Sequence, residues 1–251
     1  MLSEYLYKRI LVKNGCDLKL NNVAFLTTIF PMEYQFLIDF FDSLSKQTYK
    51  NFDVIVVNDS YKDFDKIKEQ YCELNVVELP CLKTPAKNRE FGINFCKDEK
   101  YEVLIFGDSD DYFSDNRIES SLSALNNNDI VVNDVSLFDD SGIYETMYMS
   151  NRLKDNSKIS FEYIQNKNIF GLSNTAIKLD ILEEVVFDED LVAVDWHLYK
   201  GLLKNRSNAI FINKAITYYR QYKDNTVGLQ VTDGKYYLWW EQKNGEMNEV
   251  N

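Results

Sequence analysis

The chain has 251 residues, of which 45% are hydrophobic and 14% aromatic, and it contains nine glycines and three prolines. This composition is typical of a globular protein with a sizeable core, so extended disorder is excluded except at the ends. The 28 Lys and Arg residues are outnumbered by 40 Asp and Glu, and the formal net charge is −12. Such an acidic chain lacks the basic surface of a nucleic-acid-binding protein.

The four cysteines do not show the spacing of a zinc site. Cys16, Cys72, Cys81 and Cys96 include no C-x-x-C pair, and the single histidine, His197, does not complete a Cys/His cluster near any of them. We therefore expect free thiols in a reducing compartment. No apolar run approaches the roughly 18 residues of a membrane span, and the N-terminus lacks a signal-peptide pattern. We expect a cytoplasmic location, with peripheral attachment to the inner face of the membrane left open.

The first predicted element is a helix over residues 2–13. Leu2, Leu6 and Ile10 recur there at helical intervals, with basic residues opposite them. This spacing favours a helix packed on the protein body, and a helix lying on a membrane surface is the alternative.

Strands and helices then alternate. Apolar, β-branched runs predict strands at 23–30, 52–57, 75–79 and 103–107. Apolar residues at intervals of three and four predict helices at 33–45, 64–72 and 87–96. Strand, helix, strand is the order of the βαβ unit, so these residues predict a parallel sheet with helices on its faces.

The alternation loosens after residue 111. The patterns predict helices at 118–125, 160–165, 179–185 and 194–203, and strands at 129–138, 209–211 and 216–221. We expect the strands of this second half to be antiparallel or peripheral. Neither an internal repeat nor a linker divides the chain, which predicts one continuous α/β fold with a nucleotide-binding first half.

Candidate ligand-binding residues follow three of the predicted strands. Thr28 and Phe30 end the first strand, Asn58-Asp59-Ser60 follow the second, and Asp108-Ser109-Asp110-Asp111 follow the fourth. Parallel strands present their carboxyl ends at one edge of a sheet, where open α/β sheets bind ligands. Mg²⁺ and Mn²⁺ prefer oxygen ligands, so the acidic stretch predicts a cation site there. A solvated acidic turn is the alternative.

Six segments of the chain, within residues 21–228, resemble family 2 glycosyltransferases in the order that the family has them. They are NNVAFLTTIF, SLSKQTYKNFDVIVVNDSYKD, AKNREFGIN, IFGDSDDYFSDNRI, FDEDLVAVDWHLYKGLLKN and YYRQYKDNTVG. They are similar, in turn, to the family's opening strand, its D-D-G-S segment, the helix start after it, the metal-binding D-x-D, the E-D segment and the closing loop. A D-x-D alone recurs by chance in an acidic protein, so the resemblance depends on the ordered set.

This resemblance implies the GT-A fold, which is α/β with a Rossmann-like, mostly parallel central sheet flanked by helices and a smaller antiparallel acceptor-side portion. It places one glycosyltransferase domain at 1–228, with a nucleotide-sugar-binding half at 21–115 and an acceptor-side half at 116–228. Residues 229–251 would form a C-terminal aromatic tail. Packing on the body, a dimer contact, and acceptor or membrane binding are open for this tail.

The resemblance also implies roles on the donor side. Asp59 would accept the imide N–H of a uracil or thymine base, and Phe30 would stack on that base. Asp110 would bind Mn²⁺ or Mg²⁺, supported by Asp108, which would also reach the ribose or phosphate. The other donor-binding candidates are Thr28, Lys87, Arg89, Ser109 and Arg220. An Asx-turn for Asp59, core packing for Phe30 and a surface position for Lys87 are the structural alternatives.

Asp195 is the candidate general base, because it occupies the position of the family's base at the start of a predicted helix. We expect the helix N-terminus to help keep its carboxylate ionised. A plain helix N-cap is the alternative. His197 is expected to face another side of that helix, in a structural or acceptor-side role.

Several residues depart from the family pattern. Asn58 and Ser60 stand where the family has Asp and Gly, and Val194 replaces the first acid of the acidic pair. Tyr222 stands where many relatives carry a metal-touching His, so a third protein ligand would be missing. These departures leave the base in place and put the helper groups in doubt.

The sequence thus predicts a metal-assisted inverting glycosyltransferase in cell-surface polysaccharide or glycoconjugate synthesis. UDP is the favoured nucleotide, followed by dTDP, and the acceptor would be a carbohydrate, a lipid-linked sugar or a protein. A homodimer is left open. A nucleotidyltransferase is disfavoured because the first strand is not followed by a glycine-rich, basic phosphate loop. A binding module that kept the fold and lost turnover is the alternative.

Overall fold

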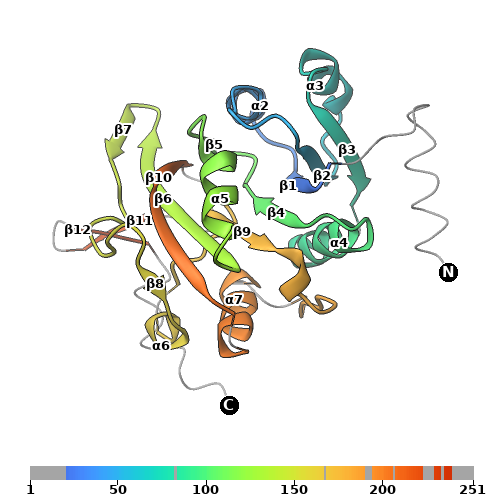
Figure 1. The fold of residues 1–251 in the computed structure, drawn as a ribbon. Coiled ribbons are helices and arrows are strands. Elements are labelled where there is room, and N and C mark those ends of the chain that lie inside the picture. The colour runs from blue at the N-terminus through green and yellow to red at the C-terminus, as the bar shows by residue number, and fades with distance from the viewer. Residues whose placement is uncertain are drawn as a thin grey trace.

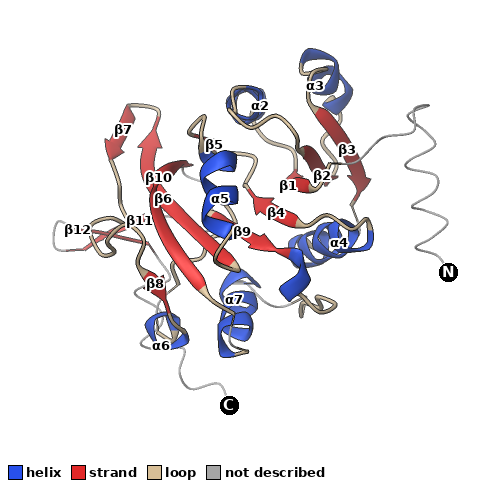
Figure 2. Cartoon of the chain, viewed as in Figure 1, coloured by secondary structure: helices blue, strands red, loops and turns tan. Residues whose placement is uncertain are grey.

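The computed structural model describes residues 21–81, 84–166, 168–189, 194–205, 207–222, 229–232 and 235–238. The predicted helix over residues 2–13, Cys16 and most of the aromatic tail, with Trp239 and Trp240, lie outside these ranges. A ten-stranded mixed sheet runs through the molecule with helices on both of its faces, and β11 and β12 form a separate two-stranded sheet (Figures 1 and 2).

The strands are β1 (Val23–Ile29), β2 (Asp53–Asn58), β3 (Asn75–Pro80), β4 (Val103–Phe106), β5 (Tyr112–Phe113), β6 (Ile130–Asp139), β7 (Gly142–Glu145), β8 (Lys158–Ile159), β9 (Thr175–Lys178), β10 (Ala209–Arg220), β11 (Leu229–Thr232) and β12 (Lys235–Leu238). The helices are α2 (Tyr34–Ser45), α3 (Phe64–Gln70), α4 (Pro85–Asp98), α5 (Arg117–Leu125), α6 (Phe161–Ile164), α7 (Val194–Lys204) and the 3₁₀ turn η1 (Leu179–Ile181).

The first half of the sheet is parallel, as the alternating pattern predicted. Its strands lie in the order β3-β2-β1-β4, and all neighbouring pairs are parallel. Side chains of β1 alternate between the two sides, with Phe25 in one apolar cluster and Ala24 and Leu26 in the other. A strand covered on both faces is rich in apolar and β-branched residues, which explains the run VAFLTTI.

The second half is mostly antiparallel, as expected, apart from the parallel pair of β6 and β10. β9 is antiparallel to both β4 and β6, so β6 runs in the same direction as β4. β10 pairs in parallel with β6 along most of its length. Two strands predicted at 209–211 and 216–221 are one strand, β10, with an irregularity between Ile212 and Ile216. The helix predicted at 179–185 is only the 3₁₀ turn η1.

Helices cover the two faces of the sheet with separate apolar clusters. Residues of α2, α3 and α5 pack in one cluster, and residues of α4, α6 and α7 pack in the other. Gly92 lets α4 lie close to the sheet, because a Cβ at that position would come within 2.6 Å of the Leu26 side chain. The first turn of α4 is thereby held near the carboxyl ends of β1 and β2.

Two further expectations concern the described part of the chain. Within it, Cys72, Cys81 and Cys96 are free thiols, as expected. None of its helices combines the length and the apolar character that a membrane span requires. The division into halves at residue 115 stays a prediction.

Candidate active site

The carboxyl ends of β1, β2, β3, β4, β6 and β10 lie at one edge of the sheet, because these six strands run in the same direction. The segment from Gly107 to Asp111, which we call the acidic loop, follows β4 at this edge. It leads to β5, which pairs with β10 at the far side of the sheet. The predicted strand-end residues, which follow β1, β2 and β4, are therefore brought to one edge.

Asp59 is held by two side chains that the sequence did not point to. Asn88, a buried residue in the first turn of α4, donates to Oδ2 of Asp59 at 3.2 Å, and the Cys81 thiol donates to Oδ1 at 3.1 Å. The backbone N–H of Asp59 donates to the carbonyl of Ile29 at 2.7 Å. Each carboxylate oxygen keeps a further lone pair, so the oriented carboxylate is able to accept a ligand N–H.

The two departures beside Asp59 have visible consequences. The Asn58 amide donates to Glu78 at 2.7 Å and to the carbonyl of Tyr61 at 3.1 Å, and its oxygen accepts the Tyr61 N–H at 2.8 Å. Asn58 therefore closes the turn after β2. Ser60 has φ of 71°, in the left-handed region that favours glycine. The family's glycine at this position thus matches the backbone conformation of the turn, and in this chain a serine adopts the same conformation.

Ser109 and Asp111 anchor the acidic loop from inside. The hydroxyl of Ser109, which is buried, donates to the carbonyl of Thr28 at 2.8 Å. Asp111 is fully buried, accepts a hydrogen bond from the Ser173 hydroxyl and accepts the Arg220 N–H at 2.8 Å. Ser173 also accepts the Asp108 N–H at 3.2 Å. These residues hold the loop, and Asp108 and Asp110 are its carboxylates with exposed surface.

Asp110 faces a tyrosine instead of a third ligating residue. The Tyr222 hydroxyl donates to Oδ2 of Asp110 at 3.0 Å, and the Tyr222 ring packs on Phe36 with centroids 5.3 Å apart. Burial, followed by the charge of Asp108, raises the pKa of Asp110 to about 6, although the Tyr222 hydrogen bond lowers it. Burial, followed by the charges of Asp110 and Asp108, raises the pKa of Asp111 well above its ordinary value. Negative charge is therefore poorly compensated in the acidic loop.

Arg89 links the acidic loop to Asp195. Its guanidinium lies 3.7 Å from Oδ1 of Asp108. The charges of Arg89 and Asp108 both act on Asp195, the second residue of α7. Thus two carboxylates from distant parts of the chain, one after β4 and one on α7, face a shared arginine from α4.

Asp195 does not show the depressed pKa that a helix N-terminus alone would produce. Burial raises its pKa to about 6, and this outweighs the hydrogen bond from the Trp196 N–H, the Arg89 charge and an Asn168 hydrogen bond, which all lower it. The Trp196 N–H lies 2.7 Å from Oδ1 of Asp195. The backbone N–H at the start of α7 lowers the pKa in the expected direction, but desolvation is the larger effect. A carboxyl with a pKa near 6 is still mostly ionised at neutral pH.

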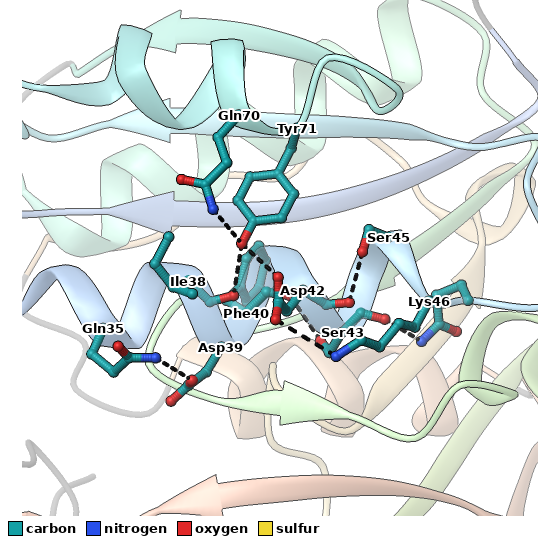
Figure 3. A network of polar contacts seen from close by, with 11 residues as sticks. Gln35, Ile38, Asp39, Phe40, Asp42, Ser43, Ser45, Lys46, Gln70 and Tyr71 are labelled. Carbon is teal, nitrogen blue, oxygen red and sulfur yellow. Dashed lines mark hydrogen bonds and ion pairs between the residues drawn. The ribbon is translucent and has the colours of Figure 1, made fainter.

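Arg220, predicted to contact the donor, is buried among protein groups. Its guanidinium donates to Asp39 at 2.5 Å and to the carbonyl of Asp110 at 2.7 Å, and it lies 4.2 Å from the ring centroid of Phe36. Asp39 is fixed in turn by Gln35, which donates to its other oxygen at 2.8 Å (Figure 3). Figure 3 also shows the hydroxyl of Tyr71, after α3, bonded to Asp42, which ties α3 to α2.

Three other singled-out residues take different positions. Lys87 forms an ion pair with Glu90 at 2.8 Å within α4. Phe30 is 42% exposed at the carboxyl end of β1, where it is accessible to a ligand ring. His197 is exposed and lines a surface groove together with Glu183 and Glu184. Asp195 is not among the residues that line this groove.

The residues present fit a divalent cation only if a ligand completes its coordination. Within the described ranges there is no group of three or more His, Cys, Asp or Glu side chains arranged to hold a metal ion. Asp108 and Asp110 offer two carboxylates with poorly compensated charge. Mg²⁺ characteristically uses one or two protein carboxylates together with phosphate oxygens and water. The donor set therefore suits a cation bound together with a diphosphate.

Comparisons with known proteins identify the family and the fold. Residues 28–186 match the family model described as glycosyl transferase family 2. A comparison with curated proteins found no match.

Among solved structures, the chain is similar to S. aureus TarS 1-349, with a TM-score of 0.64 and 18% identity over 79% of this chain and 60% of that chain. TarS 1-349 in complex with UDP-GlcNAc gives a TM-score of 0.64 and 16% identity over 81% and 59%. GalNAc-T7 with UDP, GalNAc and Mn²⁺ gives 0.58 and 11% over 83% and 45%. The chain thus spans about 60% of the TarS 1-349 chain. Because the family match covers more than half of the sequence, the chain belongs to glycosyl transferase family 2, and its structure has the GT-A fold.

Proposed function

We propose that this glycosyltransferase transfers a sugar, with inversion, from a nucleotide diphosphate sugar to an acceptor hydroxyl in cell-surface polysaccharide or glycoconjugate synthesis. The observation that carries the proposal is that Arg89 pairs with Asp108 and its charge also acts on Asp195, next to the sheet edge that holds Asp59. UDP is the favoured nucleotide. The TarS and GalNAc-T7 structures contain UDP or a UDP-sugar, which supports that choice.

In this proposal, Asp59 accepts the imide N–H of the base, in the orientation imposed by Asn88 and Cys81. Phe30 stacks on the ring from the end of β1. Thr28, Ser109 and Arg220 act at the donor site mainly by holding the acidic loop. Lys87, which pairs with Glu90, would contact the donor from the first turn of α4. Arg89 is the cation best placed to meet the diphosphate, because it already faces Asp108.

Asp195 is proposed as the general base. The acceptor oxygen attacks the anomeric carbon while its proton passes to the Asp195 carboxylate, and the bond between that carbon and the diphosphate oxygen breaks on the opposite face. The nucleoside diphosphate leaves with the bonding electron pair, so the configuration inverts. Mn²⁺ or Mg²⁺ held by Asp108 and Asp110 would supply neutralisation of the charge that develops on the diphosphate.

The test is nucleotide binding followed by thermal unfolding of the full chain. We expect UDP with Mn²⁺ to raise the unfolding temperature more than dTDP or GDP, and we expect Asp110→Ala to abolish the metal-dependent part of the shift. Asp140→Ala, in the turn after β6, is the matched control and should keep the full shift. If no nucleotide shifts the wild type with or without Mn²⁺, the proposed donor site is wrong.

A second candidate is a binding module that kept the fold and lost turnover. The hydrogen bond between Tyr222 and Asp110 favours it, because that phenol satisfies an oxygen that a cation would use. This alternative predicts that the chain binds carbohydrate or protein but releases no nucleotide from any UDP-sugar. Mass spectrometry of products from a panel of nucleotide sugars and acceptors separates the two.

A further inference from the structure

A fully buried arginine lies behind the acidic loop. Arg117, the first residue of α5, has no exposed surface. Its guanidinium packs 4.2 Å from the ring centroid of Phe113 and 5.3 Å from that of Phe25. Burial of a cation is costly unless opposite charges or hydrogen bonds compensate for the lost water.

Hydrogen bonds compensate Arg117 only in part. Nη2 donates to the carbonyl of Phe106 at 2.5 Å, and Nε donates to Oδ1 of Asn133 at 3.2 Å. Among the described residues, Nη1 has no hydrogen-bond partner. Phe106 is the last residue of β4, so Arg117 is bonded to the backbone directly before the acidic loop.

Opposite charges complete the environment of Arg117. The carboxylates that act on it are Asp111 and Asp108, the two ends of the acidic sequence. Arg89 and Arg220 also approach the loop, but each is shared with a further carboxylate, Asp195 and Asp39 respectively. Arg117 is therefore the cation buried most deeply behind the loop.

A chain of buried polar contacts connects Arg117 to the far end of the loop. The amide of Asn133 donates to the Thr217 hydroxyl at 3.0 Å, and that hydroxyl donates to the carbonyl of Ser173 at 2.8 Å. Ser173 bonds both Asp111 and the Asp108 N–H. Hydrogen-bonded side chains of β6 and β10 thus connect Arg117 to residues that hold both ends of the loop. We expect a substitution at Arg117 to disturb these hydrogen bonds and with them the loop.

We propose that Arg117 is a positioning residue, an internal counter-charge that holds the acidic loop in its ligand-binding conformation before any cation arrives. The role of the loop as a cation and diphosphate site rests on the proposed function. In the wild type, the acidic loop then stays ordered without a divalent cation. Without the charge of Arg117, the loop needs a divalent cation to stay ordered. Arg117 acts on Asp108 and Asp111, and the cation would be held by Asp108 and Asp110, so each of them reduces the repulsion between the carboxylates of the acidic loop.

Amide hydrogen exchange of the full chain tests this. In the wild type we expect the amides of Gly107, Asp108 and Asp111, which are hydrogen-bonded, to be protected equally with EDTA and with Mn²⁺. In Arg117→Met they should exchange roughly tenfold faster with EDTA and recover with Mn²⁺, while core peptides elsewhere stay protected. Arg117→Lys, which keeps the charge, should recover most of the protection without metal. If Arg117→Met does not fold, Arg117→Gln takes its place.

Arg152→Met is the matched control, because Arg152 also packs on an aromatic ring, that of Tyr148, at 4.5 Å. This variant should leave the protection of the acidic loop unchanged. Unchanged protection in Arg117→Met with EDTA would overturn the proposal. Faster exchange would also overturn it if neither Mn²⁺ nor the Arg117→Lys variant restores the protection, because lost packing alone would then explain the change. UDP binding is measured separately, so failure of the donor site does not change the reading of the exchange data.

Discussion

Asp110 and Asp195 have the same raised pKa, about 6, for the same main reason, which is burial. Their surroundings nevertheless assign them different tasks. Asp110 lies inside a cluster of carboxylates with poorly compensated charge, which suits a residue that would hold positive charge. Asp195 lies apart from that cluster on α7 and faces Arg89, which suits a residue that takes up a single proton.

Asp195→Asn is predicted to lower the rate of sugar transfer by about 10²–10⁴-fold, because the amide does not accept the acceptor proton. UDP binding should stay close to that of the wild type, since Asp195 is not proposed to contact the nucleotide. Rates from nucleotide release and affinities from calorimetry measure the two effects. His197→Ala, exposed on the same helix, is the control and should transfer normally. Transfer by Asp195→Asn at the wild-type rate would exclude Asp195 as the base.

The pKa of Asp195 also predicts a pH profile. The base must be ionised, so kcat/KM should fall about tenfold per pH unit below about pH 6 and level off above pH 7. The effect on stability has the opposite sign: the folded state binds this proton more tightly than the unfolded state, so the carboxyl's contribution to the free energy of unfolding decreases as the pH rises from about 4 to 6. A kcat/KM that stays flat down to pH 5 would contradict the assignment.

Tyr222→Phe removes the hydrogen bond that lowers the pKa of Asp110. Protons should then compete better for this carboxylate, so Mn²⁺-supported UDP binding is expected to weaken several-fold near pH 6 and to approach the wild type near pH 8. Calorimetric titrations at both pH values measure this. Tyr218→Phe, on β10, should behave as the wild type. An equal loss at both pH values would show that Tyr222 contacts the ligand directly.

At the scale of elements, the junction between β4 and the acidic loop depends on a glycine. A Cβ on Gly107 would lie 2.5 Å from the Phe25 ring and 2.7 Å from the Phe113 ring, two rings whose centroids are 5.2 Å apart. The absence of a side chain lets the loop begin directly against the α5 face of the sheet. The position of the carboxylates therefore depends on this close packing.

Gly107→Ala is predicted to lower the free energy of unfolding by about 1–3 kcal/mol through overpacking and to weaken UDP binding by displacing the acidic loop. Gly201→Ala is the control: among the described residues, a Cβ added at Gly201 would meet no atom within 4 Å outside its own helix backbone, and the residue is interior to α7. That variant should be more stable by about 0.5–1 kcal/mol. Denaturant unfolding measures both. Equal stability of Gly107→Ala and the wild type would contradict the packing argument.

The sequence predicted most elements because apolar periodicity is strong where both faces of a strand are buried. The order of strands and helices from β1 to α5 followed from it, apart from the two-residue β5. β9 was missed, since only Thr175–Lys178 form it and a turn precedes them. Asn213 and Lys214 interrupt the apolar run of β10, and the structure keeps one strand across that interruption. The local pattern of apolar residues does not show that a strand continues across polar residues.

The same limit applies to the site. Strand-end carboxylates could be predicted, because parallel strands bring their ends together whatever the side chains do. Asn88, Ser173 and Arg117 could not, since each meets its partner only in the fold: Ser173 and Asp111 are 62 residues apart. The A-K-N segment at the start of α4 was the one available signal for Asn88. Burial, which raises the pKa of Asp195, is likewise a property of the folded molecule.

At the scale of the whole molecule, one sheet edge collects the nucleotide-side residues after β1 and β2, the acidic loop after β4 and the proposed base on α7. The net charge of −12 would repel a nucleotide diphosphate sugar, so the proposed donor site calls for local cations such as Arg89 and for the proposed divalent ion. The aromatic tail was predicted to begin at residue 229. The structure places β11 and β12 in its first part, and its role stays a prediction.

The stereochemistry of transfer tests the central claim most directly. Attack opposite the departing nucleotide, with Asp195 as base, requires an α-linked UDP-sugar to give a β-configured product. Proton NMR of the first product formed by the full chain with Mn²⁺ and an α-linked UDP-sugar, the acceptor being water or a sugar hydroxyl, distinguishes the anomers. We predict the β anomer, and its absence with Asp195→Asn. A first product in the α configuration would contradict the account.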